Sequence, residues 1–265
     1  MKNRYFRNIL LGCLLVCMLI VLAGCDIRID GVNVGKAEYK LTEQLSAPAK
    51  PGGELEVATE VGLIDITGSE TDQCNVTAVI TAKAPSEEEA QELAEKVKIS
   101  LETAGDKIIV KTQKPPKKSN CSIGISYDIT VPNQTSLHVS SNVGNIDIAH
   151  ITGSVRASTN VGNVACSSFA GDIDGRTNVG NVTVSYSATA GPAPDVRLET
   201  NVGEASFVGP AELSATVDAS TQIGSISTSR PLTVTGKINK SVHGTIGDGK
   251  GRVNMRTNVG SITIK

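Results

Sequence analysis

The chain has 265 residues, of which 39% are hydrophobic and 26 are glycine, an ordinary globular proportion that excludes disorder and collagen. Tyr5 and Phe6 lie in an N-terminal segment that we expect to be removed, and the five remaining aromatic residues are too few for a platform that stacks nucleic acid bases. Loss of Lys2, Arg4 and Arg7 with that segment changes the net charge from −2 to −5, with 22 basic and 27 acidic residues, which does not favour polyanion binding.

Residues 1–24 are predicted to be an export signal. Residues 2–8 contain three basic residues and no acidic one, and the apolar stretch Ile9–Leu22 follows. A helix over this stretch would reach only about 21 Å, short of the roughly 30 Å hydrocarbon core of a bilayer. A signal peptide is therefore favoured over a permanent span, and a plain secretory signal or a short anchor helix is the alternative to the lipoprotein signal described next.

The end of this segment, Leu22-Ala23-Gly24-Cys25, resembles the bacterial lipobox. The resemblance implies that the thiol of Cys25 receives a diacylglyceryl group and that cleavage makes Cys25 the lipidated, palmitate-bearing N-terminus. Two acyl chains on one residue suffice for stable attachment to a membrane. We therefore expect an extracytoplasmic protein anchored to the cell membrane by lipid. In a host with two membranes, Asp26 would resemble an inner-membrane retention signal, but the sequence does not identify the envelope type.

Residues 25–52 are expected to form a lipid-anchored linker. They end in Ala47-Pro48-Ala49-Lys50-Pro51-Gly52, a composition typical of a tether that lifts a folded body away from the membrane. The folded body is then expected over residues 53–265.

Three cysteines remain in the body: Cys74, Cys121 and Cys166. An oxidising compartment permits one disulfide, and Cys74–Cys121 is the predicted pair because both fall in one subdomain. The cysteines and the three histidines are scattered and do not supply the short spacing of a metal site. We therefore predict no metal and no other cofactor.

A repeated tetrad dominates the body. Thr-Asn-Val-Gly occurs at 159–162, 177–180, 200–203 and 257–260, with close variants at 59–62, 141–144 and 221–224. Between Gly144 and Gly224 the tetrad glycines are spaced by 18, 18, 23 and 21 residues, a period too short for repeats built from helix pairs.

Apolar residues alternate with period two on both sides of each tetrad, which is typical of strands with one buried face. The Thr and Val of the tetrad are expected to point inward with them, and Cys166 is expected to be a buried free thiol. In one repeat the inward positions are Val155, Ala157, Thr159, Val161, Val164 and Cys166.

A unit of two short strands cannot bury its own apolar face, so equivalent residues of successive units must stack on one another. The sequence therefore predicts an all-β fold, a single-chain β-solenoid of the parallel β-helix kind. Glycine suits the corner because it tolerates positive φ and close backbone approach. The tetrad asparagines are expected to stack as an amide ladder about 4.8 Å apart, with sugar binding as the alternative role. They are Asn142, Asn160, Asn178, Asn201 and Asn258.

Outward positions carry charges that alternate from one unit to the next. Arg156, Asp174, Arg197 and Asp218 follow one another in chain order, so opposite charges are expected to face each other across neighbouring strands. Between Gly224 and Gly260, the segment Ser241–Ile246 is expected to be a degraded corner, and His243 part of that turn and not of a site.

Residues 72–132 are predicted to be an inserted strand–helix–strand subdomain, because the first two tetrad glycines are 82 residues apart. Ser86 followed by Glu87-Glu88-Glu89 is a capping box that begins its helix. The insertion is expected to cover the N-terminal end of the array. The C-terminal segment Ile262–Lys265 is expected to leave an unpaired edge that docks another chain.

The Val-Gly-Asn corner, the insertion after the first coil and the entry into the array at Val131-Pro132 resemble the bacterial β-strand-repeat "putative adhesin" group, close to the head GIN domain. The resemblance covers about residues 53–265. It implies the fold and no catalytic residue, because the group has no common activity that a motif could transfer.

We therefore expect a non-catalytic cell-envelope lipoprotein whose repeat surface serves adhesion or contact with a glycan, cell-wall polymer or envelope protein. A polysaccharide lyase or hydrolase is the alternative, with Asp147, Asp172 and Asp174 as the nearest carboxylates. An accessory lipoprotein in envelope-stress signalling is a third reading. Converging carboxylates would favour the enzyme, and a flat polar face would favour adhesion. That face would contain Asn145, Asn163, Asn181, Ser225 and Ser261.

Overall fold

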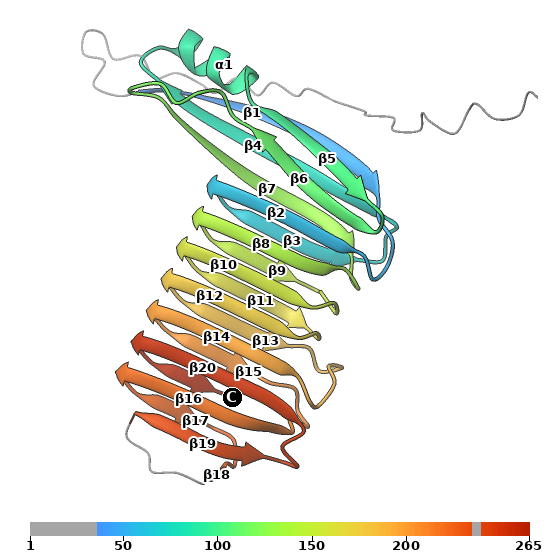
Figure 1. Ribbon diagram of the computed structural model, residues 1–265, viewed down its shortest axis with the longest axis vertical. Helices are drawn as coiled ribbons and strands as arrows, with labels where there is room; N and C mark the ends of the chain where they lie inside the picture. Colours follow the sequence, from blue (N-terminus) through green and yellow to red (C-terminus); the bar gives the residue numbers. More distant parts are fainter. Residues whose placement is uncertain (1–35, 235–239) are drawn as a thin grey trace, which may run out of the picture.

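The computed structural model describes residues 36–234 and 240–265 (Figure 1). Nearly all of the elements in these ranges are strands, and the remaining one is the helix α1 (Glu87–Glu95). The strands are β1 (Ala37–Pro48), β2 (Glu54–Val61), β3 (Ile64–Ser69), β4 (Gln73–Ala84), β5 (Lys98–Ala104), β6 (Lys107–Gln113), β7 (Ser122–Pro132), β8 (Ser136–Val143), β9 (Ile146–Ala149), β10 (Val155–Val161), β11 (Val164–Phe169), β12 (Ile173–Val179), β13 (Val182–Tyr186), β14 (Asp195–Val202), β15 (Ala205–Val208), β16 (Ala215–Ile223), β17 (Ile226–Thr228), β18 (Thr233–Val234), β19 (Ser241–Ile246), β20 (Gly251–Val259) and β21 (Ile262–Ile264).

Two large mixed sheets contain all of these strands. The first sheet has 10 strands in the order β1-β4-β7-β3-β9-β11-β13-β15-β21-β17. The second has 11 strands in the order β18-β19-β16-β20-β14-β12-β10-β8-β2-β6-β5. Figure 1 shows how the strands of successive repeats lie one below another along the long axis of the molecule.

Equivalent residues of successive repeats lie side by side in the parallel part of the second sheet. Val155 is paired with Ile173, and Ile173 with Val196, in the register that the sequence predicts. All three side chains are buried, as are the inward residues of the first sheet. A Cβ atom at Gly175 would lie 3.0 Å from Val182 of the other sheet, so the two inner faces are in direct contact. The core is one continuous layer between the sheets.

The segment 72–132 extends both sheets at the N-terminal end of the array. β7 and β4 add to the first sheet beyond β3, and β6 and β5 add to the second beyond β2. The helix begins where the capping box predicts, and the Ser86 side chain accepts a hydrogen bond of 3.2 Å from the backbone N–H of Glu89.

The prediction that residues 25–52 form a linker is wrong for its second half. Strand β1 pairs in antiparallel fashion with β4 along its whole length and buries Leu41, Leu45 and Ala47. These apolar side chains make β1 part of the folded body, because they complete the core under the first sheet. The predicted signal peptide and Cys25 lie outside the described residues.

The strand order at the C-terminal end does not follow the chain. Strands β20 and β21 lie between the pair β14 and β15 and the pair β16 and β17. The expected free edge at Ile262–Lys265 is therefore wrong, because β21 is paired on one side with β15 and on the other with β17. The edge strands at this end are the short β17 and β18.

The expected corner at Ser241–Ile246 is also wrong. This segment is strand β19, which runs antiparallel to β16 and places His243 opposite Asp218. Their Nδ1 and Oδ1 atoms are 3.6 Å apart. The antiparallel strand closes the end of the second sheet where the parallel repeats stop.

Candidate functional site

The tetrad glycines form a tightly packed corner. Gly162 has φ of 144° and Gly180 has φ of 141°, values that side-chain-bearing residues rarely adopt. A Cβ atom at Gly162 would lie 2.1 Å from the carbonyl oxygen of Gly144, and one at Gly180 would lie 2.0 Å from that of Gly162. Glycine is required here both by the backbone angle and by the close backbone of the neighbouring repeat.

The tetrad threonines point inward and connect adjacent repeats by hydrogen bonds. Thr177 and Thr200 are buried, and their hydroxyls donate hydrogen bonds of 2.9 Å to the carbonyl oxygens of Gly162 and Gly180 respectively. Each hydroxyl thus satisfies a corner carbonyl of the adjacent repeat. The inward direction of these threonines was predicted from the sequence, and their hydrogen bonds to the neighbouring repeat were not.

The structure brings the five tetrad asparagines together in one exposed ladder. The Nδ2 atom of Asn178 donates to Oδ1 of Asn160 at 2.9 Å, that of Asn201 to Asn178 at 2.9 Å, and that of Asn258 to Asn201 at 3.0 Å. Asn160 donates in the same way to Asn142. A side-chain amide has two N–H donors and an oxygen that can accept two hydrogen bonds, so the ladder leaves one donor and one acceptor site per residue for other contacts.

The tetrad valines point outward, so the expectation that they continue the inward columns is wrong. The glycine that follows turns the chain, so the side chain before it is directed away from the core. The seven aliphatic side chains of this row are 42–64% exposed, and each is in register with its neighbour. In spatial order they are Val61, Val143, Val161, Val179, Val202, Val259 and Ile223.

We call this aliphatic row, together with the asparagine ladder beside it, the corner ridge. At the usual spacing of neighbouring strands, seven residues extend over about 29 Å. Fully burying one such side chain stabilises a protein by about 1.5–3 kcal/mol. A row of seven exposed side chains therefore gives up stability that burial would provide, and folding alone does not explain it. Contiguous apolar patches of this kind mark interaction surfaces.

A second polar row follows the corner glycines. The Oδ1 atoms of Asn145 and Asn163 accept hydrogen bonds of 2.9 and 2.8 Å from the backbone N–H groups of Asn163 and Asn181. Oδ1 of Asn181 accepts a hydrogen bond of 2.8 Å from the backbone N–H of Glu204. The three asparagines of the expected face therefore lie in one row, and their side-chain carbonyl oxygens hold the corners. Beyond Glu204, the backbone hydrogen bonds place Ser261 and then Ser225 in the same row.

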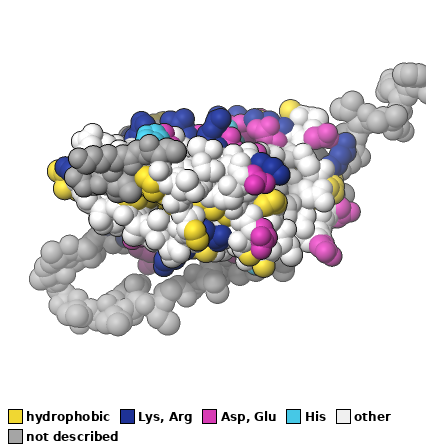
Figure 2. Space-filling model, turned by 90° about the horizontal axis from the view of Figure 1, so that it is seen from below, with side chains coloured by type: hydrophobic (Ala, Val, Ile, Leu, Met, Phe, Trp, Pro, Cys, Tyr) yellow, Lys and Arg dark blue, Asp and Glu magenta, His cyan; other side chains and the backbone are white. Residues whose placement is uncertain are grey.

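The outward face of the second sheet carries a network of ion pairs. Arg176 is 2.7 Å from Asp174 and 3.7 Å from Glu199, and Arg197 is 2.7 Å from Glu199. Arg156 is 3.9 Å from Asp174. The hydrogen bond from Arg176 to Asp174 raises the pKa of that guanidinium. Figure 2 shows the molecule from one end, and basic and acidic side chains are interspersed along the upper edge of its outline.

The predicted alternation of charge stops after Arg197. Strand β20 places Asn254 between Arg197 and Asp218, so these two opposite charges are not neighbours. The expectation assumed that stacking follows chain order, and the insertion of β20 overturns it.

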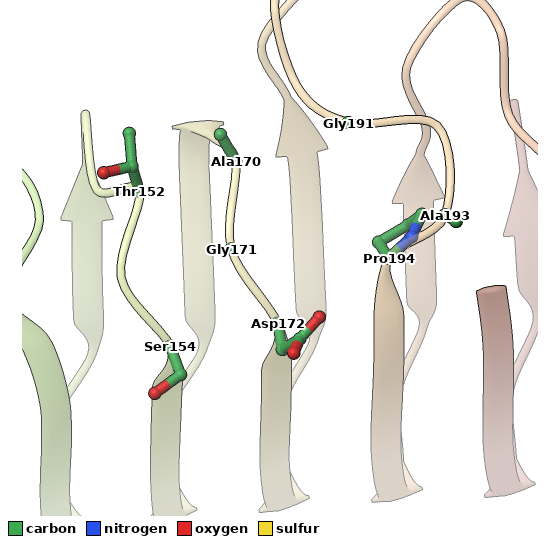
Figure 3. Close-up of a pocket in the computed structure, with 8 residues that line it drawn as sticks. All are labelled: Thr152, Ser154, Ala170, Gly171, Asp172, Gly191, Ala193 and Pro194. Carbon is green, nitrogen blue, oxygen red and sulfur yellow. The ribbon is translucent and has the colours of Figure 1, made fainter.

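An open groove of about 550 Å³ lies where the strands of the second sheet begin. Asp172, Asp174 and Asp195 line it together with Arg156 and Arg197. An adjoining hollow of about 320 Å³ is drawn in Figure 3, which shows the Asp172 side chain directed toward the strand that follows Pro194.

Two of the groove carboxylates have structural partners. Oδ1 of Asp172 accepts a hydrogen bond of 2.9 Å from the backbone N–H of Asp195, and Asp174 accepts two from Arg176. The third candidate of the enzyme reading, Asp147, does not line the groove, because it lies on β9 in the other sheet. In the described ranges, no group of three or more His, Cys, Asp or Glu side chains is arranged to hold a metal ion.

Three aspartates lie side by side on the outward face of the first sheet. Asp65 is in register with Asp128 on one side and with Asp147 on the other. Partial burial, followed by the charges of Asp128 and Asp147, raises the pKa of Asp65. Partial burial also raises the pKa of Asp147. Sequence reasoning missed this row because Asp128 belongs to the insertion.

The predicted disulfide is absent, since Cys74 and Cys121 are both free cysteines. They lie at opposite ends of the β4–β7 pair, Cys74 beside the Asn75–Thr130 pair and Cys121 beside the Lys83–Ser122 pair. A separation of roughly 30 Å along the strands rules out a bond. Cys166 is buried, as expected, and burial raises its pKa to about 12.

Comparisons with known proteins bear on the fold. No protein-family model matches the chain, and no curated protein matches its sequence. A solved structure of a "putative cell adhesion protein" from Clostridium sporogenes is similar, with a TM-score of 0.50, 18% identity, and coverage of 84% of this chain and 99% of that one. At that identity the likeness supports the all-β fold and not an activity.

Two further solved structures are more distant. A "putative adhesin" from Bacteroides fragilis has a TM-score of 0.36 and 13% identity, covering 84% of this chain and 97% of that chain. A "putative lipid binding protein" from Parabacteroides distasonis has a TM-score of 0.24 and 12% identity, covering 84% and 96%. The part of the chain described by the structure has no helix long and apolar enough to cross a membrane.

Proposed function

We propose that the chain is a non-catalytic cell-envelope lipoprotein, anchored through acylated Cys25, that presents the corner ridge for adhesion or for contact with cell-wall or surface components. The observation that carries this proposal is the unbroken row of half-exposed aliphatic side chains beside an amide ladder. Contiguous exposed apolar surface is a feature of binding sites.

The proposed architecture is a single-chain β-solenoid. In-register parallel pairing of successive repeats, on both sides of the glycine corner, supports it. We propose residues 1–24 as the signal peptide, the residues between Cys25 and β1 as the linker, and residues 37–265 as the body, with 72–132 as its inserted subdomain. A solenoid suits presentation, because many identical weak contacts along a rigid row add up to firm attachment.

The lipid anchor is tested on cells. When the full chain is expressed in bacteria supplied with labelled palmitate, the label should enter the wild-type protein and not the Cys25→Ala variant. Labelling that survives the substitution, or the absence of any label in the wild type, would contradict the anchor.

The ridge is tested by binding of the cell-displayed chain to isolated envelope fractions and to a glycan array. Replacing Val161 and Val179 together by Ser should lower binding at least tenfold. Val234, which is 41% exposed but lies on β18 outside the ridge, provides the matched control as Val234→Ser. Equal binding by the ridge variant and the wild type would show that the ridge is not the interaction surface.

A polysaccharide-active enzyme is the second candidate, and the acidic groove on the second sheet is the observation that favours it. It ranks second because Asp172 and Asp174 already hold a backbone N–H group and Arg176. Release of reducing ends from cell-wall polysaccharide by the wild type, and its loss in Asp174→Asn, would replace the adhesion proposal by this one.

A further inference from the structure

We propose that the corner ridge docks against the corner ridge of a second copy of this chain in an antiparallel arrangement. The inference rests on the proposed use of the ridge as an interaction surface and names the partner. Three features of the described residues support it: spacing, composition, and the difference between the two ends of the ridge. The size of the ridge determines the affinity that we expect.

Spacing is the first feature. Backbone pairing holds the aliphatic side chains at one repeat, about 4.8 Å, over the whole row. A partner that contacts every member of the row must repeat with the same distance, and a second copy does so by construction. Rows of identical side chains at this spacing pack between one another to form dry interfaces, as in the steric zippers of stacked β-strands.

Composition is the second feature. The five central units present only Asn and Val in the ridge, so two copies approach without bringing like charges together. Each ladder asparagine retains one donor and one acceptor site. Facing ladders can therefore hydrogen-bond to each other with the same repeat, while the aliphatic rows exclude water.

The ends of the ridge give the orientation. The asparagine position is occupied by Glu60 at the β2 end and by Gln222 at the β16 end. An antiparallel dimer places each Glu60 carboxylate near the Gln222 amide of the other copy, whereas a parallel dimer brings the two Glu60 residues together. Glu60 is 3.1 Å from Lys114, and this ion pair offsets part of the repulsion between two Glu60 carboxylates. The two rows of the ridge favour the same orientation. A twofold axis across the ridge sets asparagine row against asparagine row, whereas a twofold axis along the ridge sets each asparagine row against the aliphatic row of the other copy. Either twofold axis closes the assembly at two copies.

The size of the ridge determines how strongly two copies are expected to bind. One row of aliphatic residues and one row of asparagines form a strip that is narrower than the roughly 800 Å² per partner of a standard stable interface. We therefore expect a weak dimer, with a dissociation constant on the order of 10–100 µM. Anchoring both copies on one membrane would raise their effective concentration and favour the contact.

The association is measured by sedimentation equilibrium of the mature chain with Cys25→Ser, which contains every described residue and carries no lipid. Between about 5 and 500 µM the wild type should change from monomer to dimer. Replacing Val161 and Val179 by Lys should weaken the dimer at least tenfold, and Val234→Ser should leave it unchanged. Circular dichroism melting curves check that each variant is folded.

Orientation is measured by crosslinking in a background with Cys25→Ser and Cys121→Ser, which removes the anchor cysteine and the half-buried native thiol. The end residues of the aliphatic row, Val61 and Ile223, are exposed, and replacing them leaves Glu60 in place. A mixture of Val61→Cys and Ile223→Cys chains should form mixed disulfide dimers, whereas Val61→Cys chains alone should form none. Disulfides between two Val61→Cys chains, with none in the mixture, would overturn the antiparallel arrangement.

A wild type that stays monomeric over the whole range, or a dimer that ignores the ridge variants, overturns the inference. If the monomeric protein binds a neutral glycan or an envelope fraction through the ridge, the proposed function stands and the second copy is not the partner. If the ridge variants change neither association nor envelope binding, both proposals fail.

Discussion

Asn258 donates a hydrogen bond of 3.0 Å to Oδ1 of Asn201, a residue 57 positions earlier in the chain. Chain order would place Gln222 beside Asn201, but β20 takes that position and β16 lies between β20 and β19. The arrangement keeps all asparagine-containing tetrads adjacent in space and leaves Glu60 and Gln222 at the two ends. A Gln side chain is one methylene longer than Asn, so it does not continue the amide ladder with the same geometry.

This ladder predicts opposite effects of two substitutions. Asn258→Ala removes one amide hydrogen bond and should lower the free energy of unfolding by about 1 kcal/mol, whereas Gln222→Asn should extend the ladder to a further strand and raise it by about 0.5 kcal/mol. Asn254→Ala, on the outer face of the same strand β20, is the control for the first change. Urea unfolding measures all three, and a loss of stability in Gln222→Asn would contradict the ladder explanation.

The corner glycine predicts a larger effect. Gly180→Ala combines a φ of 141° with a Cβ atom 2.0 Å from the carbonyl oxygen of Gly162, so the substitution should cost about 3 kcal/mol or more. Gly191 has open space around its Cβ position, and Gly191→Ala should change stability by less than about 1 kcal/mol. Thermal unfolding distinguishes the two, and equal melting temperatures would show that the corner relaxes around the methyl group.

The buried threonine predicts a smaller cost. Thr177→Val keeps the shape of the side chain but removes the hydrogen bond to Gly162, so it should lower the free energy of unfolding by about 1 kcal/mol. Thr177→Ser retains the hydroxyl but removes a buried methyl group, which itself costs about 0.8 kcal/mol, so the valine variant is the one that isolates the hydrogen bond. The comparison is made in urea, and a valine variant as stable as the wild type would mean that this hydrogen bond adds nothing net.

The inward columns and the asparagine ladder could be predicted because a strand alternates with period two and because one repeat aligns with the next. The outward direction of Val161 could not be predicted. The period-two pattern that places Thr159 inward also places Val161 inward, and the pattern is interrupted only because the next glycine turns the chain. The place of β20 between β14 and β16 could not be deduced either, because two repeats with the same pattern of inward residues can stack in either order. Strand β1 was not predicted, because its end contains Pro and Ala and is typical of a linker, although Leu41 and Leu45 lie on its buried face.

The cysteines differ in their surroundings, and this predicts their reactivity. Burial raises the pKa of Cys74 and of Cys166 to about 12, so neither thiol forms the reactive thiolate near neutral pH. In the native protein a thiol reagent should label Cys121 and leave the other two unmodified, and unfolding should expose all three. Mass spectrometry of labelled peptides gives the result, and native labelling of Cys166 would show that the core between the sheets opens.

The aspartate row predicts how stability depends on pH. Burial and the neighbouring Asp128 and Asp147 raise the pKa of Asp65, so the folded state holds this proton more tightly than the unfolded state does. Stability should therefore fall as pH rises through the raised pKa of the folded state. Asp65→Asn removes the charge and should stabilise the protein near neutral pH by a few tenths to about 1 kcal/mol, the usual scale for like charges on adjacent strands. The gain should disappear in acid, where the wild-type carboxyl is protonated in both states.

Asp72→Asn, in the exposed turn between β3 and β4, is the control, and urea unfolding at several pH values makes the comparison. If Asp65→Asn were less stable than the wild type near neutral pH, the charge of Asp65 would be net favourable in the folded state, and the predicted repulsion among the three carboxylates would be contradicted.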